Sequence, residues 1–200
     1  MARDLGKIHG KYWNDEETLS KKYLAPEGYL NTPPVPIAWA MGFDEAWPKW
    51  KPQWKKVLTD QGHDAGDLSK FPKADAVFCK MAEDSARVRD TLVAHWKAKP
   101  YRTLCHGDAR SDNLFEKPDG SGLIWIDWQL VYTCSSIGLD LGWGVWGCCE
   151  ADVRRREKEI IHEYYESLCA AHPAAAEQVT EEDIFHDYKL GLILWSMALM

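Results

Sequence analysis

Leu104-Cys105-His106-Gly107-Asp108-Ala109-Arg110-Ser111-Asp112-Asn113 is the first of two stretches that indicate the fold of this chain. The second is Leu123-Ile124-Trp125-Ile126-Asp127-Trp128-Gln129. Together they place Asp108 five residues before Asn113, and Asp127 nineteen residues after Asp108 at the end of an apolar run. Phosphoryl transfer of the kinase type needs three such groups. One carboxylate accepts the proton of the attacking hydroxyl, and an amide oxygen and a second carboxylate hold the magnesium ions that bridge the nucleotide phosphates.

A β-hairpin is predicted between these two stretches. Asn113-Leu114-Phe115 is a short apolar run, and residues 117–122 (KPDGSG) form a dense turn signal. Residues 123–128 form a second run, rich in β-branched and aromatic side chains. A turn between two short strands brings Asn113 beside Asp127 although fourteen positions separate them. Oxygen ligands of this kind suit magnesium, which completes its shell with waters and substrate phosphates.

The motif resembles a known superfamily. H-G-D-x-x-x-x-N at 106–113, I-D-W-Q at 126–129 and the pair Asp140-Leu141 resemble the aminoglycoside phosphotransferase and choline-kinase-like superfamily, small-molecule kinases with the protein-kinase fold. The D-W-Q ending and Asp140-Leu141 resemble most its ecdysteroid-kinase-like branch. The resemblance covers roughly residues 1–147 and is dense only from Leu104 to Trp143. H-G-D alone is a weak signal, whereas the complete set at this spacing is specific.

This resemblance implies an α+β fold that is predominantly helical, with residues 1–200 forming the C-terminal lobe of a protein-kinase-like domain around a small catalytic β-hairpin. It also implies transfer of the γ-phosphate of ATP to a hydroxyl of a small molecule, with ATP and Mg²⁺ required. Asp108 would be the catalytic base, and Asn113 and Asp127 would bind the metal.

Four other residues of the motif are expected to support the site. His106 is expected to orient the loop through a backbone hydrogen bond, and Gly107 to supply a backbone conformation denied to other residues. Asp140 resembles the family's buried aspartate that braces the catalytic loop. Arg110 lies where many protein kinases have a lysine that contacts the transferred phosphate. A bidentate arginine can do the same, and a solvated loop arginine fits the position equally well.

Composition agrees with an enzyme domain and excludes several partners. The 200 residues are 46% hydrophobic and include 11 Trp, which is enough for a core, and the net charge of −7 argues against nucleic acid or an acidic membrane as the main partner. No basic-then-apolar leader is present, and the apolar run 190–200 is too short to span a bilayer. Six Cys without a C-x-x-C spacing favour free thiols in a reducing compartment, and therefore the cytoplasm.

Periodicity predicts helices over most of the remaining chain. The prolines between Ala25 and Pro36 predict a loop. The predicted helices cover 2–13, 43–58 (broken at best, because of Pro48 and Pro52), 74–96, 140–149, 152–171 with Asp152 as N-cap, and 184 onward after a capping-box-like Thr180–Asp183. Trp47, Trp50 and Trp54 at helical spacing indicate core packing, and an aromatic wall for a quaternary amine or a steroid-like body is the alternative.

No glycine-rich loop precedes a strand-borne lysine, and no G-x-x-x-x-G-K-[ST] motif is present. We therefore expect a fragment that lacks the ATP-binding N-lobe and is truncated at its C-terminus, so that its partners are a small-molecule hydroxyl acceptor and the missing lobe. Such a chain would fold at least partly, expose an apolar surface and lack kinase activity alone. A non-catalytic remnant is the competing hypothesis. A hydrolytic metal centre on His106 and Asp108 is a weaker one.

Overall fold

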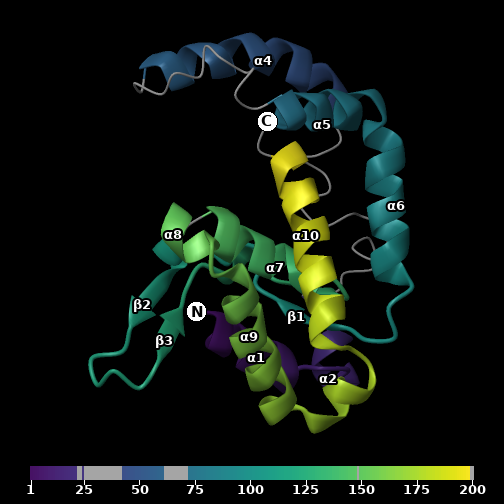
Figure 1. Ribbon diagram of the computed structural model, residues 1–200. Coiled ribbons are helices and arrows are strands. Elements are labelled where there is room, and N and C mark those ends of the chain that lie inside the picture. The colour runs from purple at the N-terminus through teal and green to yellow at the C-terminus, as the bar shows by residue number, and fades with distance from the viewer. Residues whose placement is uncertain (22–23, 25–41, 61–71, 148, 199–200) are drawn as a thin grey trace.

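The protein is predominantly helical with two small two-stranded sheets, as seen in a computed structural model that describes residues 1–21, 24, 42–60, 72–147 and 149–198 (Figure 1). The predicted mostly helical α+β composition is confirmed. The helices are α1 (Ala2–Lys11), α2 (Glu16–Leu19), α4 (Phe43–Asp60), α5 (Pro72–Glu83), α6 (Ser85–Lys97), α7 (Ile137–Gly142), α8 (Ala151–Arg154), α9 (Glu157–Ala171) and α10 (Glu181–Ala198). The strands are β1 (Thr103–Cys105), β2 (Leu114–Glu116), β3 (Leu123–Trp125) and β4 (Tyr132–Cys134).

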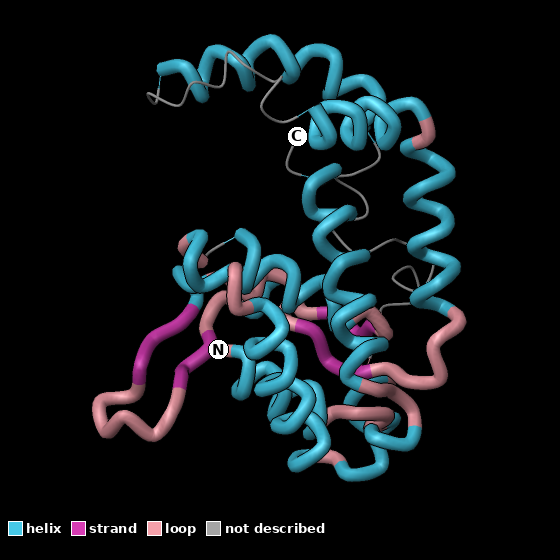
Figure 2. Tube along the Cα trace, in the orientation of Figure 1, coloured by secondary structure: helices cyan, strands magenta, loops and turns pink. Residues whose placement is uncertain are grey.

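Two short antiparallel pairs frame the loop that carries the motif (Figure 2). The predicted hairpin is present as β2 paired with β3, with Phe115 opposite Ile124. Strand β1 pairs with β4, with Leu104 opposite Thr133. The second pairing was not predicted, because three residues of mixed polarity at 132–134 show no alternation that marks a strand. The loop from His106 to Asn113 therefore leaves one sheet and enters the other.

Helix α10 holds α7 in place through an unusually close contact. A Cβ at Gly138 would overlap the carbonyl oxygen of Asp187, and one at Gly191 would overlap the carbonyl oxygen of Gly138. The Asp187 carboxylate accepts hydrogen bonds from the Gly138 N–H at 2.9 Å and from the Trp96 indole N–H at 2.7 Å. Burial raises the pKa of Asp187 above its usual value. Helix α7 is thereby fixed by backbone contact and by a hydrogen-bonded buried carboxylate.

Helix α4 corrects one prediction. It runs without a break from Phe43 to Asp60 although it contains Pro48 and Pro52, and Figure 1 shows it as an arched ribbon. Each proline removes one backbone hydrogen bond and bends a helix. Phe43 and Trp47 are buried and pack with Met81, so that tertiary packing compensates for the lost hydrogen bonds. Trp47 therefore has the core role that the spacing of the tryptophans indicated.

Two predicted long helices are in fact pairs of helices. The predicted helix 74–96 is interrupted at Asp84, whose carboxylate binds Lys80 at 3.0 Å and Arg87 at 2.8 Å and which separates α5 from α6. The predicted helix 152–171 is divided into α8 and α9, and Asp152 lies inside α8 instead of capping it. The predicted helix 140–149 begins earlier, at Ile137, and continues as a π-helix over Trp143–Gly147.

The predicted capping box before the last helix is present, and the helix itself begins at Glu181, three residues earlier than predicted. The Asp183 N–H donates to Thr180 Oγ1 at 3.2 Å, and Asp183 Oδ2 accepts from the Thr180 N–H at 2.9 Å, which is a reciprocal capping box. The predicted loop 25–36 lies outside the described residues. Within the described ranges, no helix is both long and apolar enough to cross a membrane.

Replacing Gly191 by alanine tests the contact between α7 and α10. The added methyl group would overlap a backbone carbonyl that cannot move alone, so the free energy of unfolding should fall by about 2 kcal/mol or more. Urea unfolding followed by circular dichroism measures this change. The control is Gly42→Ala, where no atom of the described residues beyond its chain neighbours lies within 4 Å of the added Cβ and the change should stay within about 0.5 kcal/mol. Equal midpoints for the two variants would contradict the proposed contact.

Candidate active site

The loop from His106 to Asn113, which carries the candidate site residues, begins at the end of β1 and is held by Asp140 of α7. The Asp140 carboxylate accepts the His106 N–H at 2.6 Å and the Gly107 N–H at 2.9 Å, one on each oxygen. Asp140 is 1% exposed, so these hydrogen bonds form in a low-dielectric environment where charged acceptors bind strongly. The same carboxylate lies 3.3 Å from His9 Nε2 of α1. One buried side chain thus fixes the first two residues of the loop.

Gly107 makes the sharp turn that follows. Its φ of +83° lies in the left-handed region, and a Cβ at this position would overlap the Leu130 carbonyl oxygen. The loop can therefore pass against the segment after β3 only with glycine here. This close approach brings the residues around Asp108 and those around Asp127 together.

His106 joins the same two segments through its imidazole ring. Its Nε2 lies 2.9 Å from the Ile126 carbonyl oxygen, and its Nδ1 lies 3.2 Å from the Asp108 backbone nitrogen. Because a carbonyl only accepts and a backbone N–H only donates, the proton resides on Nε2. Both ring nitrogens are thereby engaged, so His106 has no free nitrogen for a metal ion, as the hydrolytic alternative would require.

The Asp108 carboxylate is held on both oxygens. Oδ1 accepts from the Trp143 indole N–H at 2.6 Å, and Oδ2 accepts from Asn113 Nδ2 at 3.0 Å. Arg110 Nε lies 3.4 Å from Oδ2. The side chain is 15% exposed, so it is partly accessible to a ligand. This is the accessibility that a base needs.

Asn113 is oriented by the residue five positions before it. Its Nδ2 donates both to the Asp108 carbonyl oxygen at 2.9 Å and to the Asp108 carboxylate. Its Oδ1 accepts no hydrogen bond from the described residues and is the atom available to a cation. The Asn113 carbonyl accepts the Ile126 N–H at 3.1 Å, which places the backbone of Asn113 next to that of Asp127.

Asp127 has the least constrained side chain of the set. It is exposed, and its carboxylate makes no hydrogen bond or ion pair with the described part of the chain. Its backbone is left-handed, with φ of 61° and ψ of 52°, which is uncommon outside glycine. Within the described part of the chain, these two oxygen donors, Asn113 Oδ1 and the Asp127 carboxylate, have no protein partner and lie on adjacent segments, and such a donor set fits Mg²⁺.

Arg110 lies at the open edge of the site. It is 41% exposed and also lies 3.6 Å from Asp112, which is 74% exposed. Its guanidinium therefore lies between two carboxylates, Asp108 and Asp112, on a partly exposed side chain.

Three residues that sequence reasoning did not assign to the site contribute to it. His9 falls within the predicted helix 2–13 and was given no role of its own, and neither Tyr164 nor Trp143 was assigned one. Tyr164 lies 2.7 Å from His9 Nδ1, and burial raises its pKa well above the usual value, so that it remains a neutral hydrogen-bond donor to His9. His9 was detectable as the polar residue within the apolar face of a helix, whereas no local pattern marks Tyr164 or Trp143.

A second cluster with metal-ligand chemistry is structural. His9, Cys105 and Asp140 are all buried and bring their ligand atoms within 4.8 Å of one another. The Asp140 oxygens accept backbone N–H groups and both His9 nitrogens have partners, so the cluster satisfies its own polar groups. A metal here would have to displace the hydrogen bonds that hold the loop.

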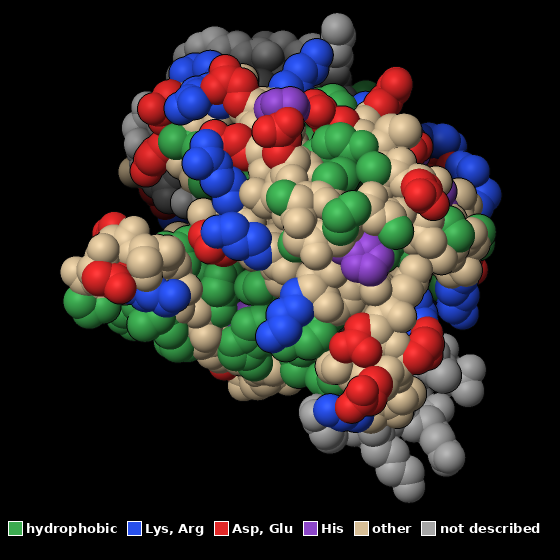
Figure 3. Space-filling model, turned by 90° about the horizontal axis from the view of Figure 1, so that it is seen from below, with side chains coloured by type: hydrophobic (Ala, Val, Ile, Leu, Met, Phe, Trp, Pro, Cys, Tyr) green, Lys and Arg blue, Asp and Glu red, His purple; other side chains and the backbone are tan. Residues whose placement is uncertain are grey.

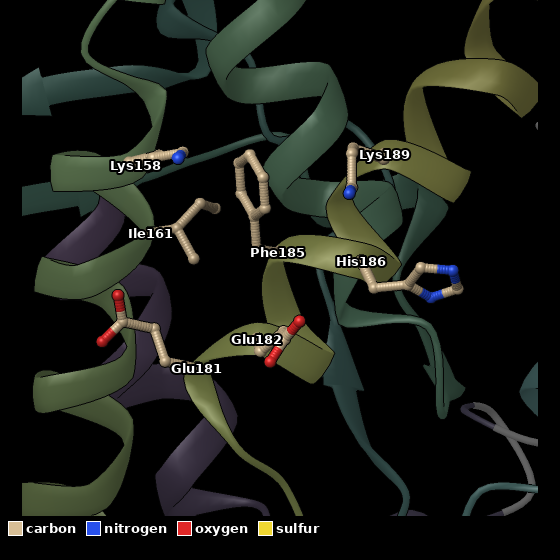
Figure 4. Close-up of a pocket in the computed structure, with 7 residues that line it drawn as sticks. All are labelled: Lys158, Ile161, Glu181, Glu182, Phe185, His186 and Lys189. Atoms are coloured by element: carbon tan, nitrogen blue, oxygen red, sulfur yellow. The ribbon is translucent and has the colours of Figure 1, made fainter.

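A surface pocket of about 540 Å³ lies elsewhere, between α9 and α10. Figure 4 shows Phe185 between Lys158 and Lys189, whose Nζ atoms lie 6.0 and 4.8 Å from the ring centroid. Glu181 at its edge is bound to His162 at 2.8 Å, and this contact raises the pKa of His162. None of the predicted site residues lines this pocket, so it is not the candidate active site.

Comparison with known proteins supports a single family. The model of the ecdysteroid kinase-like family matches residues 47–175, a range that contains every candidate residue from His106 to Asp140. Neither the curated proteins nor the solved structures include a significant match to this chain.

Replacing Asp140 by asparagine tests the support of the loop from His106 to Asn113. The new NH₂ group would face a backbone donor, so the free energy of unfolding should fall by about 3 kcal/mol, the cost of leaving such a buried donor unpaired. Hydrogen exchange at the amides of His106 and Gly107 should accelerate more than at the residues of β1. The exposed Asp44→Asn should change neither quantity. Unchanged protection of the two amides in Asp140→Asn would contradict this role.

Proposed function

The chain belongs to the ecdysteroid kinase-like family, and from this premise we propose that it transfers the γ-phosphate of ATP to a hydroxyl group of a small molecule. The observation that carries the proposal is the arrangement of Asp108, Asn113 and Asp127. The partly exposed Asp108 carboxylate is hydrogen-bonded to the Asn113 side chain, and the Asn113 carbonyl accepts the N–H of Ile126, the residue before Asp127. Among the described residues, neither Asn113 Oδ1 nor the Asp127 carboxylate has a protein partner. General-base and metal-binding groups are adjacent in this way in kinase-type phosphoryl transfer.

In the proposed reaction the acceptor hydroxyl donates a hydrogen bond to Asp108. Its oxygen forms a bond to the γ-phosphorus as the bond from that phosphorus to the bridging oxygen breaks, and Asp108 takes up the hydroxyl proton. Asn113 Oδ1 and the Asp127 carboxylate are the ligands proposed for magnesium. When bound, the ion neutralises charge on the phosphate oxygens. Arg110, at the open edge, is the side chain proposed to contact the transferred phosphate.

The surface next to these residues supports nucleotide binding. Phe115, Ile124 and Ile126 of the β2–β3 hairpin are 56%, 44% and 40% exposed. Phe115 and Ile124 are cross-strand partners, and Ile126 lies two residues further along the same face. Figure 3 shows hydrophobic side chains gathered along the projecting hairpin. An apolar face beside a metal site suits the flat base of a nucleotide, or the lobe that would cover it.

The proposed activity, and the variants below, are tested by ATP consumption of a purified full-length version of the protein that carries an ATP-binding N-lobe, with a panel of hydroxyl acceptors. Residues 1–200 alone are expected to be inactive. The panel contains amino-alcohols, sugars and hydroxylated steroids, and an ecdysteroid is the first compound because the family name refers to that class. Turnover that depends on an acceptor supports the proposal. A protein that binds Mg²⁺–ATP but turns over none of the panel would instead support the non-catalytic alternative.

The base is tested by Asp108→Asn, which keeps the shape of the side chain but removes its ability to take up a proton. Turnover should fall by at least about a hundredfold, the usual scale for loss of a general base. Mg²⁺–ATP affinity should change little. The matched control is Asp112→Asn in the same loop, which should retain turnover. Near-normal turnover of Asp108→Asn would show that another group is the base.

The metal ligands are tested by calorimetric titration of ATP with and without Mg²⁺. Asp127→Ala should abolish the magnesium-dependent part of binding, and Asn113→Ala should weaken it less, because a neutral amide is a weaker ligand than a carboxylate. Asp119→Ala is the control, since Asp119 is an exposed carboxylate in the turn of the same hairpin. If Asp127→Ala and wild type bind alike, Asp127 is not a ligand.

A further inference from the structure

Trp143 makes a direct contact with the candidate base. Its indole N–H donates to Asp108 Oδ1 at 2.6 Å, a short, charge-assisted hydrogen bond. The other carboxylate oxygen accepts from Asn113, a residue of the loop itself. The indole N–H of Trp143 is therefore the hydrogen-bond donor that comes from outside the loop, and it fixes the plane of the Asp108 carboxylate.

The indole is itself held in place by the C-terminal helix. The Trp143 and Trp195 rings are stacked with centroids 4.4 Å apart and an interplanar angle of 19°. Trp195 is 2% exposed, and its own indole N–H donates to the Leu139 carbonyl oxygen at 2.8 Å. A Cβ at Gly147 would lie 2.8 Å from Cε3 of Trp143, so the ring has little room to move on that side.

A change of helix type brings this segment against the loop. Trp143–Gly147 is a π-helix that follows α7 directly. A π-turn adds a residue to the turn and redirects the side chains that follow, and such turns are frequent at functional sites. The next residue, Gly144, packs on the loop as well, since a Cβ there would lie 2.7 Å from the Ala109 carbonyl oxygen. The π-helix thus contacts two consecutive loop residues, Asp108 and Ala109.

We propose that Trp143 is a positioning residue, which holds the Asp108 carboxylate in the orientation that receives the acceptor hydroxyl, and that Trp195 of α10 sets the position of Trp143. This inference rests on the proposed function, because only a reacting carboxylate needs a fixed orientation. Kinase-type transfer depends on alignment of the hydroxyl with the γ-phosphate, so small displacements of the base lower turnover strongly. The indole acts through Asp108 and takes no part in proton transfer.

The first experiment follows the orientation of Asp108 without any turnover. The Asn113 side-chain amide donates to both the carbonyl and the carboxylate of Asp108, so its NMR signals report where that carboxylate lies. Trp143→Phe keeps a stacked ring and removes the N–H. Exchange of the Asn113 amide protons with water should then accelerate by about tenfold, the factor expected for a weakened hydrogen bond to a charged group.

Trp96→Phe is the matched control. It removes an indole N–H that donates to a buried carboxylate, Asp187, at 2.7 Å, but does so outside the catalytic loop. The Asn113 signals should keep their wild-type exchange rate in this variant. If Trp143→Phe does not fold, Gly147→Ala is used instead. Gly147 is exposed, and the added methyl group would displace the Trp143 indole. Unchanged Asn113 exchange in the variant used would overturn the proposal.

The second experiment separates positioning from stability and from the proposed function. The assay uses any acceptor that wild type phosphorylates, or water in basal ATP hydrolysis. Trp143→Phe should lower kcat about tenfold or more, while the KM for Mg²⁺–ATP stays within about twofold of the wild-type value. Equal kcat in wild type and variant would overturn the proposal. If wild type turns over no ATP, the proposed function fails, and positioning is then decided by the NMR measurement alone.

Discussion

The hydrogen bonds from the backbone of His106 and Gly107 to the Asp140 carboxylate are the interaction on which the candidate site depends. They tie the first turn of a loop to a helix more than thirty positions later, inside the protein, where an unpaired N–H would be costly. Because these amides are fixed, Gly107 must adopt its left-handed conformation, and His106 reaches the backbone at Ile126. The placement of Asp108 and Asn113 follows from that geometry.

The site combines a constrained half and an open half. Asp108 and Asn113 are bonded to each other and to neighbouring segments, so their orientation exists before any ligand arrives. Asp127 has a constrained backbone but an exposed carboxylate without a partner among the described residues. Because Asp108 and Asn113 are already ordered, a ligand loses less conformational entropy when it binds to them. The exposed carboxylate of Asp127 can bind a multivalent cation without first breaking a hydrogen bond to the described residues. A partly ordered and partly open site of this kind suits a substrate that arrives as an anion together with its bound cation.

The hairpin, the helical character and the capping box at Thr180 could be predicted from the sequence, because each has a local signal. These signals are the turn residues, the spacing of apolar residues and the capping residues. Sequence reasoning failed at Pro48 and Pro52, where burial of Phe43 and Trp47 overrides the local preference. It also failed at Asp84, where a carboxylate between two cations marks a helix boundary that an apolar stripe conceals. Trp143 could not be assigned from the sequence, because its partner lies thirty-five residues away and its direction is set by a π-turn.

The contact between α7 and α10 has a consequence for biosynthesis. Helix α7 ends at Gly142 and α10 begins at Glu181, so a ribosome that adds about 5–20 residues per second makes the second helix several seconds after the first. During this interval the nascent chain carries Asp140 and Trp143, but α7 lacks the surface against which it packs. Chaperones and proteases would meet this chain before α7 and Trp143 have the surface of α10 against which they pack, and that packing would be completed only as the last helix docks.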